Sequence, residues 1–281
     1  MTVAFWRALR PSQWSKNVLV VLAPAAAGVL DQADVVRDTA LMFVAFSLAA
    51  SAGYLVNDLL DLEADRAHPI KRHRPIAAGE VPVAIVPVGA AVLAGAALAV
   101  TAPIRTEATA VIAVYLVTVL AYSFGLKRVP YLELVIVASG FVLRAVGGAA
   151  AADVPISIWF AIVVSSTAVF VVVAKRESEL THIVDAQRPV LSRYRQARMI
   201  NVELLAIGSA ALAHAGWALD GDRIGARAAA AVLFLLALLR YRSRTVDGPH
   251  GEDPVAVVLR DPVLLVLGAA WAAAVVVSVS A

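Results

Sequence analysis

The sequence predicts an all-α, polytopic membrane protein, and two observations lead to this prediction. Hydrophobic residues make up 61% of the 281 residues, and the mean hydropathy is +0.81, whereas soluble domains contain about 45–50% apolar residues. Apolar stretches of roughly 15–22 residues recur along the whole chain, and each is long enough to cross about 30 Å of hydrocarbon as a helix. Because every backbone polar group must be hydrogen-bonded internally in lipid, such stretches are expected to be helices.

Nine membrane-spanning helices are predicted, within a single transmembrane domain over residues 1–281. They cover residues 17–31, 39–57, 83–102, 108–125, 131–152, 156–174, 199–219, 224–239 and 262–280. The first and eighth are the shortest, and Pro24 is expected to kink the first. Segment 1–16 is amphipathic, and no cleavage site follows a short apolar core, so we expect it to be retained in the cytoplasm and not removed as a signal peptide.

Lys and Arg residues are distributed unevenly between the two sides of this arrangement. With the N-terminus inside, the inside segments carry 19 of the 24 Lys and Arg residues, the outside loops together with the outside end of the eighth span carry 4, and Arg144 lies in the middle of a span. Cytoplasmic loops of membrane proteins carry an excess of these residues. The expected localisation is therefore the cell (inner) membrane, multi-pass, with the N-terminus and the charged loops in the cytoplasm and the C-terminus outside.

Three aspartates follow the second predicted span. Asp58, Asp61 and Asp65 are spaced i, i+3, i+7, so on a helix they fall within an arc of about 60°. Carboxylates this close repel one another unless a cation lies between them, and oxygen ligands suit Mg2+, which is commonly bound by one or two carboxylates plus substrate phosphates. We predict that these aspartates are the catalytic and metal-binding residues of a Mg2+ site, to which Asn57 adds a neutral oxygen or a donor to phosphate. The alternative is a solvated acidic helix end.

Four cations come directly after the aspartates, namely Arg66, Lys71, Arg72 and Arg74. Carboxylates followed by cations suit a diphosphate, because a metal can take one side of it and guanidinium groups the other. We predict that these residues bind substrate; the alternative is an orientation signal with contacts to anionic lipid. The chain has no cysteine, which excludes disulfides, a thiolate nucleophile and a Cys-ligated metal.

The pattern Asn57-Asp58-x-x-Asp61-x-x-x-Asp65 resembles the first Asp-rich motif of the UbiA-type intramembrane prenyltransferase superfamily. This resemblance implies nine transmembrane helices around a central cavity, with the polar site at their cytoplasmic ends. Segments 10–17, 57–79, 122–127, 139–145 and 175–180 are more narrowly similar to the decaprenyl-phosphate phosphoribosyltransferases of that superfamily. By this resemblance the donor is phosphoribosyl pyrophosphate, the acceptor is a polyprenyl (decaprenyl) phosphate, and the product serves the synthesis of mycobacterial-type cell-wall arabinan.

The chain departs from typical members of the superfamily after the sixth span. They carry a second Asp-rich motif there, whereas this chain has Lys175-Arg176-Glu-Ser-Glu179, followed by His182 and Asp185. A lysine and an arginine suit a phosphate monoester, and both the phosphoribosyl donor and the polyprenyl phosphate carry one. We predict that Lys175, Arg176 and Glu179 bind substrate. The alternative is an i, i+4 pair of Lys175 with Glu179 at a helix end.

Five further residues are predicted to bind substrate. Lys16 and Asn17 stand where the first span leaves the cytoplasmic surface, and Tyr122 and Lys127 end the fourth span on the same side; a role as interface anchors is the alternative. Arg144 lies within the fifth span, where a charged residue is functional by default. Arg144 binds a phosphate or pairs with another helix, and both interpretations stay open.

Two competing functions are distinguishable in the sequence. A prenyltransferase that moves a polyprenyl group from its diphosphate to an aromatic acceptor needs a second acidic cluster, which the segment after the sixth span does not clearly supply. A transporter or flippase predicts repeated halves and charges at the midplane, and the sequence shows no internal repeat. We therefore expect one transmembrane catalytic domain over residues 1–281, with membrane lipids and no nucleic acid among its partners; homo-oligomerisation is left open.

Overall fold

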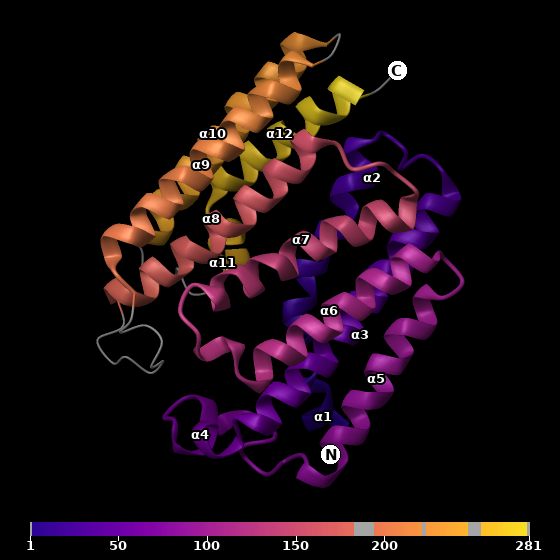
Figure 1. The fold of residues 1–281 in the computed structure, drawn as a ribbon, viewed down its shortest axis with the longest axis vertical. Helices are drawn as coiled ribbons and strands as arrows, with labels where there is room; N and C mark the ends of the chain where they lie inside the picture. Colours follow the sequence, from indigo (N-terminus) through magenta and orange to yellow (C-terminus); the bar gives the residue numbers. More distant parts are fainter. Residues whose placement is uncertain (1, 183–193, 221–222, 247–253, 280–281) are drawn as a thin grey trace. The chain divides into compact units, whose positions relative to one another are not determined.

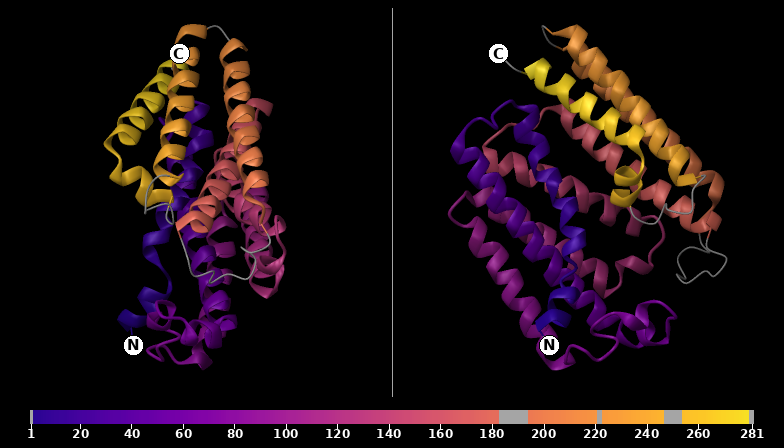
Figure 2. Two further views of the ribbon diagram at one scale, coloured as in Figure 1. Left: turned by 90° about the vertical axis from the view of Figure 1, so that its left-hand side faces the viewer. Right: turned by 180° about the vertical axis from the view of Figure 1, so that it is seen from behind.

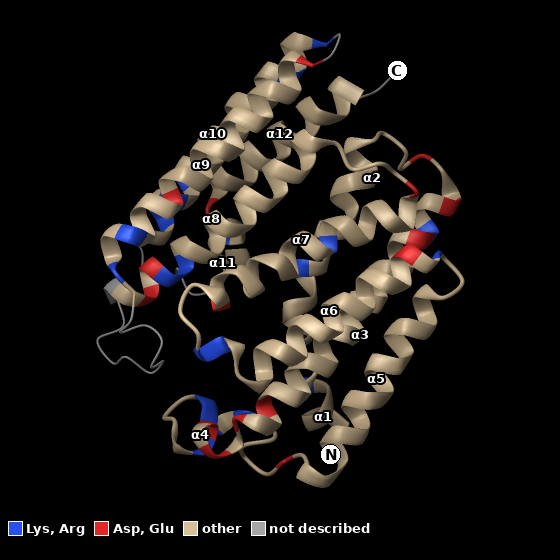
Figure 3. Ribbon diagram, viewed as in Figure 1, with Lys and Arg blue, Asp and Glu red and all other residues tan. Residues whose placement is uncertain are grey.

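The computed structural model describes residues 2–182, 194–220, 223–246 and 254–279. These residues form helices and turns, with no β-strand among them. Eight of the helices are long and apolar enough to cross a membrane. These candidate spans are Ala33–Leu60, Val83–Thr101, Thr106–Phe124, Leu132–Ala152, Ile158–Leu180, Gln196–Leu219, Ile224–Thr245 and Pro262–Val279. Charged residues lie mainly near the helix ends (Figure 3). The predicted all-α, polytopic fold is confirmed.

The first predicted span is the exception. Residues 17–31 do not form one long helix, because the 3-10 helix η1 (Pro11–Val21) is followed by the short α2 (Leu22–Ala26). Pro24 has no backbone N–H to continue an α-helix, and Gly28 adopts a left-handed conformation with φ 70° that ends the segment. Where nine spans were predicted, the described part of the chain has eight helices that qualify as candidate spans, and segment 17–31 is not among them. The eighth predicted span, by contrast, forms the full-length α10 (Ile224–Val246).

The chain forms two compact units, which we describe one at a time. Unit 1 comprises Met1–Pro24, Val29–Lys127 and Leu143–Val154. Unit 2 comprises Ala25–Gly28, Arg128–Val142 and Pro155–Ala281. That the whole chain acts as one catalytic domain remains a prediction.

Unit 1 is built around α3 (Ala33–Leu60). This helix packs against α5 (Val86–Thr101), α6 (Thr106–Phe124) and η1, and Figures 1 and 2 show α3, α5 and α6 side by side. Small residues such as Ala45, Ala49 and Gly53 on α3 let the neighbouring helices approach closely. At the end where α3 stops, α1 (Thr2–Ala8) buries Ala4 and Ala8 in a second cluster with residues of α3 and α5.

The 3-10 helix η1 lies against α7 (Leu132–Ala152) with almost no gap. A Cβ atom added to Gly148 of α7 would stand 1.8 Å from the backbone oxygen of Val20 in η1. One turn earlier, the buried Arg144 donates from Nε to Oδ1 of Asn17 at 2.7 Å. This contact fixes η1, and η1 leads directly into the polar residues described below.

We expect Gly148→Ala to lower the unfolding temperature of the purified protein in detergent, because the added methyl group overlaps a backbone atom. Overpacking of this kind costs about 1–3 kcal/mol. The matched control is Gly95→Ala in α5, where no heavy atom lies within 4 Å of the new Cβ position; there the better helix propensity of alanine leaves stability unchanged or improved. Equal unfolding temperatures for the two variants would contradict the close packing of η1.

Unit 2 contains the helices of the chain from α8 onward. They are α8 (Ile158–His182), α9 (Gln196–Leu219), α10, α11 (Pro254–Arg260) and α12 (Pro262–Val279). Helix α9 packs against both α8 and α10, and α10 packs against α12 (Figure 2). His214 of α9 accepts a hydrogen bond from Nε1 of Trp271 at 3.1 Å and stacks on Trp217, so it has a structural role between α9 and α12.

Candidate active site

The aspartate segment begins at the C-terminal end of α3 and continues into α4 (Leu62–Ala67). The two helices are not continuous, because α3 ends at Leu60 and Asp61 lies between them with φ −96° and ψ 9°. The expectation of a single unbroken helix from Asp58 to Asp65 is therefore wrong. Helical spacing is nearly kept, since the N–H of Asp61 bonds to the oxygen of Asn57 and the N–H of Asp65 to that of Asp61. Asp61, which lies at the break between α3 and α4, pairs with a different cation from Asp58 and Asp65.

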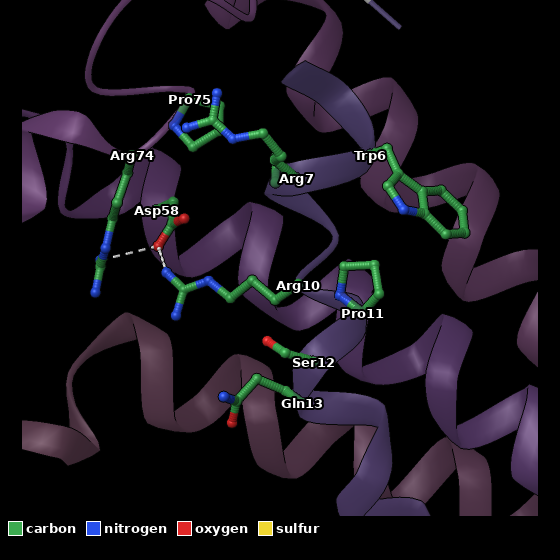
Figure 4. A pocket seen from close by; sticks show the side chains of 10 residues that line it. Trp6, Arg7, Arg10, Pro11, Ser12, Gln13, Asp58, Arg74 and Pro75 are labelled. Carbon is green, nitrogen blue, oxygen red and sulfur yellow. Dashed lines mark hydrogen bonds and ion pairs between the residues drawn. The ribbon is translucent and has the colours of Figure 1, made fainter. Parts of the chain in front are cut away.

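Asp58 and Asp65 are buried and held together by one guanidinium group. Nη1 of Arg74 donates to Oδ1 of Asp58 at 3.0 Å and to Oδ2 of Asp65 at 2.6 Å. Nη2 of Arg10 donates to the same Oδ1 of Asp58 at 2.6 Å, as Figure 4 shows. The two carboxylates are only 2% and 3% exposed, and the guanidinium groups compensate their negative charge inside the protein.

Asp61 pairs with a cation from another part of unit 1. Nζ of Lys127 lies 2.6 and 2.7 Å from the two carboxylate oxygens of Asp61 and 3.1 Å from Oδ1 of Asn57. Lys127 belongs to the 3-10 turn η4 (Leu126–Arg128) that follows α6, and Tyr122 stands in the last turns of α6. The structure thus brings Lys127 and Asn57 to the aspartates, and their binding of substrate stays a prediction. We call Asp58, Asp61 and Asp65, together with Arg10, Arg74 and Lys127, the aspartate cluster.

Arg10 is the residue of this cluster that sequence reasoning missed. It precedes Pro11, and yet its backbone is left-handed, with φ 55° and ψ 60°. A non-glycine residue seldom adopts this conformation, and such strain is typical of functional sites. The signal was present in the sequence, because Arg10 is the first residue of segment 10–17, which carried part of the family resemblance.

An open recess adjoins the aspartate cluster between the N-terminal segment and the loop before α5. Its volume is about 490 Å³. The lining residues are Trp6, Arg7, Ala8, Arg10, Pro11, Ser12, Gln13, Asp58, Arg74 and Pro75. We call it the arginine recess, and Figure 4 shows the side chains around it. Its arginines outnumber its carboxylates three to one, so it suits an anion.

The other predicted cations, in α4 and in the loop that follows it, have separate roles. Nε of Arg66 donates to the backbone oxygen of Ala77 at 3.3 Å and so supports the loop. Lys71 and Arg72 lie in the short 3-10 turn η2 (Lys71–His73), where Arg72 is exposed and its Nε contacts His73. The structure places Arg74 directly on Asp58 and Asp65.

Three predicted residues lie along η1 and its contacts. Asn17 is fully buried; its Oδ1 accepts from Arg144 and its Nδ2 donates to Oγ of Ser47 at 2.9 Å. Arg144 also donates from Nη2 to the hydroxyl of Tyr115 at 3.0 Å. Lys16 donates from Nζ to the side chain of Gln13, a residue of the arginine recess. For Arg144, pairing with another helix is the interpretation that this geometry favours.

The predicted residues of unit 2 belong to a buried network. Arg176 is 3% exposed and donates from Nε and Nη2 to the two carboxylate oxygens of Glu133, at 2.8 Å each. Its Nη1 donates to Oε2 of Glu179 at 2.6 Å. Lys175 is more exposed, and its Nζ stands 4.0 Å from Glu179. Asp185 lies outside the described residues. The role of Glu133 was missed because it is 43 positions from Arg176 in sequence.

Tyr194 completes this network. Its hydroxyl donates to Oε1 of Glu133 at 2.9 Å. Burial raises the pKa of the Tyr194 phenol, and the negative charge of Glu133 raises it further. The phenol therefore stays protonated and remains a hydrogen-bond donor at neutral pH.

The aspartate cluster is chemically suited to a divalent cation that arrives with a phosphate ligand. Among the described residues, no three His, Cys, Asp or Glu side chains gather as a preformed metal cage. Mg2+ seldom uses such a cage, because it prefers one or two carboxylates together with substrate phosphates. Asp58 and Asp65 offer hard oxygen ligands of this kind, and the guanidinium of Arg74 that bridges them marks a position where positive charge is stabilised. The residues present fit the ion.

Comparison with known proteins identifies relatives in both sequence and fold. The sequence pattern of the UbiA prenyltransferase family matches residues 17–260. A decaprenyl-phosphate phosphoribosyltransferase of Mycobacterium tuberculosis is 40% identical over 279 residues, which cover 96% of this chain and 92% of that protein. A protein of the same name from Corynebacterium glutamicum is 39% identical over 287 residues, which cover 97% and 86%.

The fold has a solved counterpart in a UbiA homologue from Archaeoglobus fulgidus, whose structure was determined with DMAPP and Mg2+ bound. The TM-score is 0.76 at 18% sequence identity, with 98% of this chain and 99% of that chain covered, so this likeness concerns the fold. Together with its apolar helices, these relationships make the protein a multi-pass membrane protein. The chain belongs to the UbiA prenyltransferase family.

Proposed function

We propose that this protein transfers the 5-phosphoribosyl group of phosphoribosyl pyrophosphate to a polyprenyl (decaprenyl) phosphate and releases pyrophosphate. The observation that carries this proposal is the similarity, along nearly the whole chain, to relatives that are named decaprenyl-phosphate phosphoribosyltransferase. The lipid product would enter the synthesis of cell-wall arabinan. The segment Lys175-Arg176, in place of a second Asp-rich motif, supports phosphoribosyl transfer over prenyl transfer.

The aspartate cluster is the proposed site of the reaction. Asp58, Asp61 and Asp65 would hold Mg2+, which neutralises the diphosphate as it leaves. Arg10, Arg74 and Lys127 now donate to carboxylates. When a diphosphate enters, these cations can donate to its oxygens instead, because charge-assisted hydrogen bonds to phosphate are as favourable as those to carboxylate.

The chemical step needs little beyond positioning and charge stabilisation. The bond from C1 of the ribose to the diphosphate breaks, and its electron pair leaves with pyrophosphate. A phosphate oxygen of the lipid supplies the electron pair of the new bond to C1. A phosphate monoester is already ionised at pH 7, so no strong general base is required. Binding both substrates beside Asp58 would supply most of the rate acceleration.

The site is proposed to face the cytoplasm of the cell (inner) membrane. The aspartate cluster lies at the same end of unit 1 as the N-terminal helix α1 (Figure 1), and the distribution of Lys and Arg favours a cytoplasmic N-terminus. Phosphoribosyl pyrophosphate is water-soluble, so a cytoplasmic site can receive it directly. Whether the protein forms a homo-oligomer stays a prediction.

One incubation tests the proposed reaction. Purified protein receives phosphoribosyl pyrophosphate labelled in the ribose, Mg2+ and decaprenyl phosphate, and the label is expected to move into the organic phase. A parallel incubation contains a prenyl diphosphate and 4-hydroxybenzoate. If a prenylated benzoate forms and all the ribose label stays in the water phase, the proposed phosphoribosyl transfer is rejected and the protein is a prenyltransferase.

A further inference from the structure

We propose that the arginine recess receives the phosphate head of the polyprenyl phosphate acceptor, and that α1 forms the apolar border along which the lipid chain leaves. This inference rests on the proposed function and assigns one of its two substrates to a place. The recess shares Asp58, Arg10 and Arg74 with the aspartate cluster, whereas Arg7 belongs to the recess and not to the cluster. An acceptor phosphate held there would therefore stand next to the site proposed for the donor diphosphate.

The lining of the recess is suited to a phosphate. Arg7, Arg10 and Arg74 contribute three guanidinium groups, each with five N–H donors. Arg7 would serve the acceptor phosphate alone, whereas Arg10 and Arg74 have enough donors to be shared with the donor diphosphate. Their contacts with Glu80, Asp58 and Asp65 use only part of this capacity. Ser12 and Gln13 add neutral hydrogen-bonding groups at the same wall. Guanidinium groups are the side chains that best match phosphate oxygens.

The ion pair at the mouth of the recess is easily replaced. Nη1 of Arg7 lies 2.9 Å from Oε2 of Glu80, and the two side chains are 53% and 41% exposed. An exposed pair of this kind contributes only about 0–1 kcal/mol. A phosphate with two negative charges can therefore compete with Glu80 for Arg7.

The border of the recess distinguishes a lipid from a soluble phosphate. Trp6 lines the recess and is 54% exposed, and Val3, one turn earlier on α1, is 74% exposed. The opposite face of α1 is buried against the end of α3 and the beginning of α5, so α1 lies at the level where these two candidate spans end. Tryptophan and apolar residues at this level are typical of a membrane interface. Phosphoribosyl pyrophosphate has no apolar part to use this border, whereas a polyprenyl phosphate has a long one.

Steady-state kinetics of Arg7→Ala test the assignment. We expect the KM for decaprenyl phosphate to increase about tenfold, because one charge-assisted contact is lost. The KM for phosphoribosyl pyrophosphate should change by less than about twofold. Arg105→Ala is the matched control, because Arg105 forms a similarly exposed ion pair with Asp153 elsewhere in unit 1; both KM values should stay unchanged. An increase confined to the KM for phosphoribosyl pyrophosphate, or no change in either KM, would overturn the assignment.

Photo-crosslinking tests the same site without turnover. The photo-reactive residue p-benzoylphenylalanine replaces Trp6 in one variant and Leu212, which is 75% exposed on α9, in the control. Labelled decaprenyl phosphate should crosslink at position 6, and unlabelled decaprenyl phosphate should compete, whereas phosphoribosyl pyrophosphate and inorganic phosphate should not. Crosslinking no stronger than at position 212, or competition by phosphoribosyl pyrophosphate, overturns the assignment. Specific crosslinking without any ribose transfer supports the lipid site and rejects the proposed reaction.

Discussion

Asp58→Ala is expected to abolish phosphoribosyl transfer, with a loss of turnover of at least about a thousandfold. Asp58 is buried, it accepts hydrogen bonds from both Arg10 and Arg74, and it borders the arginine recess. Its removal takes away a proposed metal ligand and leaves two guanidinium groups without their shared carboxylate. The initial rate of label transfer should remain at background even when the Mg2+ concentration is raised far above that used for the wild type.

The control for this variant is Glu63→Ala. Glu63 belongs to the same acidic segment, but it is exposed on α4, so its removal should leave the rate within about twofold of the wild type, as is usual for surface substitutions. Asp58→Asn keeps the shape of the side chain and should be as inactive as Asp58→Ala, provided that both variants elute as folded protein in gel filtration. Full activity of either Asp58 variant would reject the metal role of this carboxylate.

Arg176→Ala is expected to reduce the free energy of unfolding by about 3–5 kcal/mol, the usual cost of removing one partner from a buried ion pair. The guanidinium group lies between Glu133 and Glu179, which are 1% and 6% exposed. Without it, two carboxylates would stay buried and lose their cationic partner. We expect a much lower unfolding temperature in detergent and a poor yield of folded protein.

Two comparisons separate this structural role from the substrate-binding role that the sequence suggested. Lys175→Ala, at a more exposed neighbour, should hardly change the unfolding temperature. The double variant Arg176→Met with Glu133→Met removes both charges of the closest pair, and it should recover part of the stability lost in Arg176→Ala. An Arg176→Ala protein with normal stability and a raised KM for phosphoribosyl pyrophosphate would instead support direct binding of substrate.

The sequence was sufficient for the fold because the helices are specified by length and hydrophobicity. Each long apolar stretch from residue 39 onward became a candidate span, since the lipid environment leaves a helix as the only structure that satisfies the backbone. The prediction of a spanning α-helix over residues 17–31 was wrong because hydrophobicity alone does not distinguish an α-helix from a 3-10 helix. The shape of η1 depends on tertiary contacts, namely the approach to Gly148 and the hydrogen bond from Arg144 to Asn17.

Within the candidate site, the residue types were predictable and their partners were not. The spacing of Asp58, Asp61 and Asp65 was visible, but the break at Asp61 was not, because no proline or glycine marks it. Arg74 and Lys127 were expected near phosphate, and the structure adds which carboxylate each one contacts. Pairs such as Arg10 with Asp58, or Arg176 with Glu133, join positions 48 and 43 residues apart, and such pairing is decided by packing and not by local pattern.

The most direct test of the aspartate cluster is the position of the ion itself. Crystals grown with Mn2+ in place of Mg2+, and with phosphoribosyl pyrophosphate, would reveal the metal by its anomalous scattering. We expect a peak within bonding distance of carboxylate oxygens of Asp58 and Asp65, with the diphosphate on the same ion and in contact with Arg10 or Arg74. A diphosphate bound elsewhere, with these aspartates still paired only to their arginines, would contradict the proposed role of the cluster.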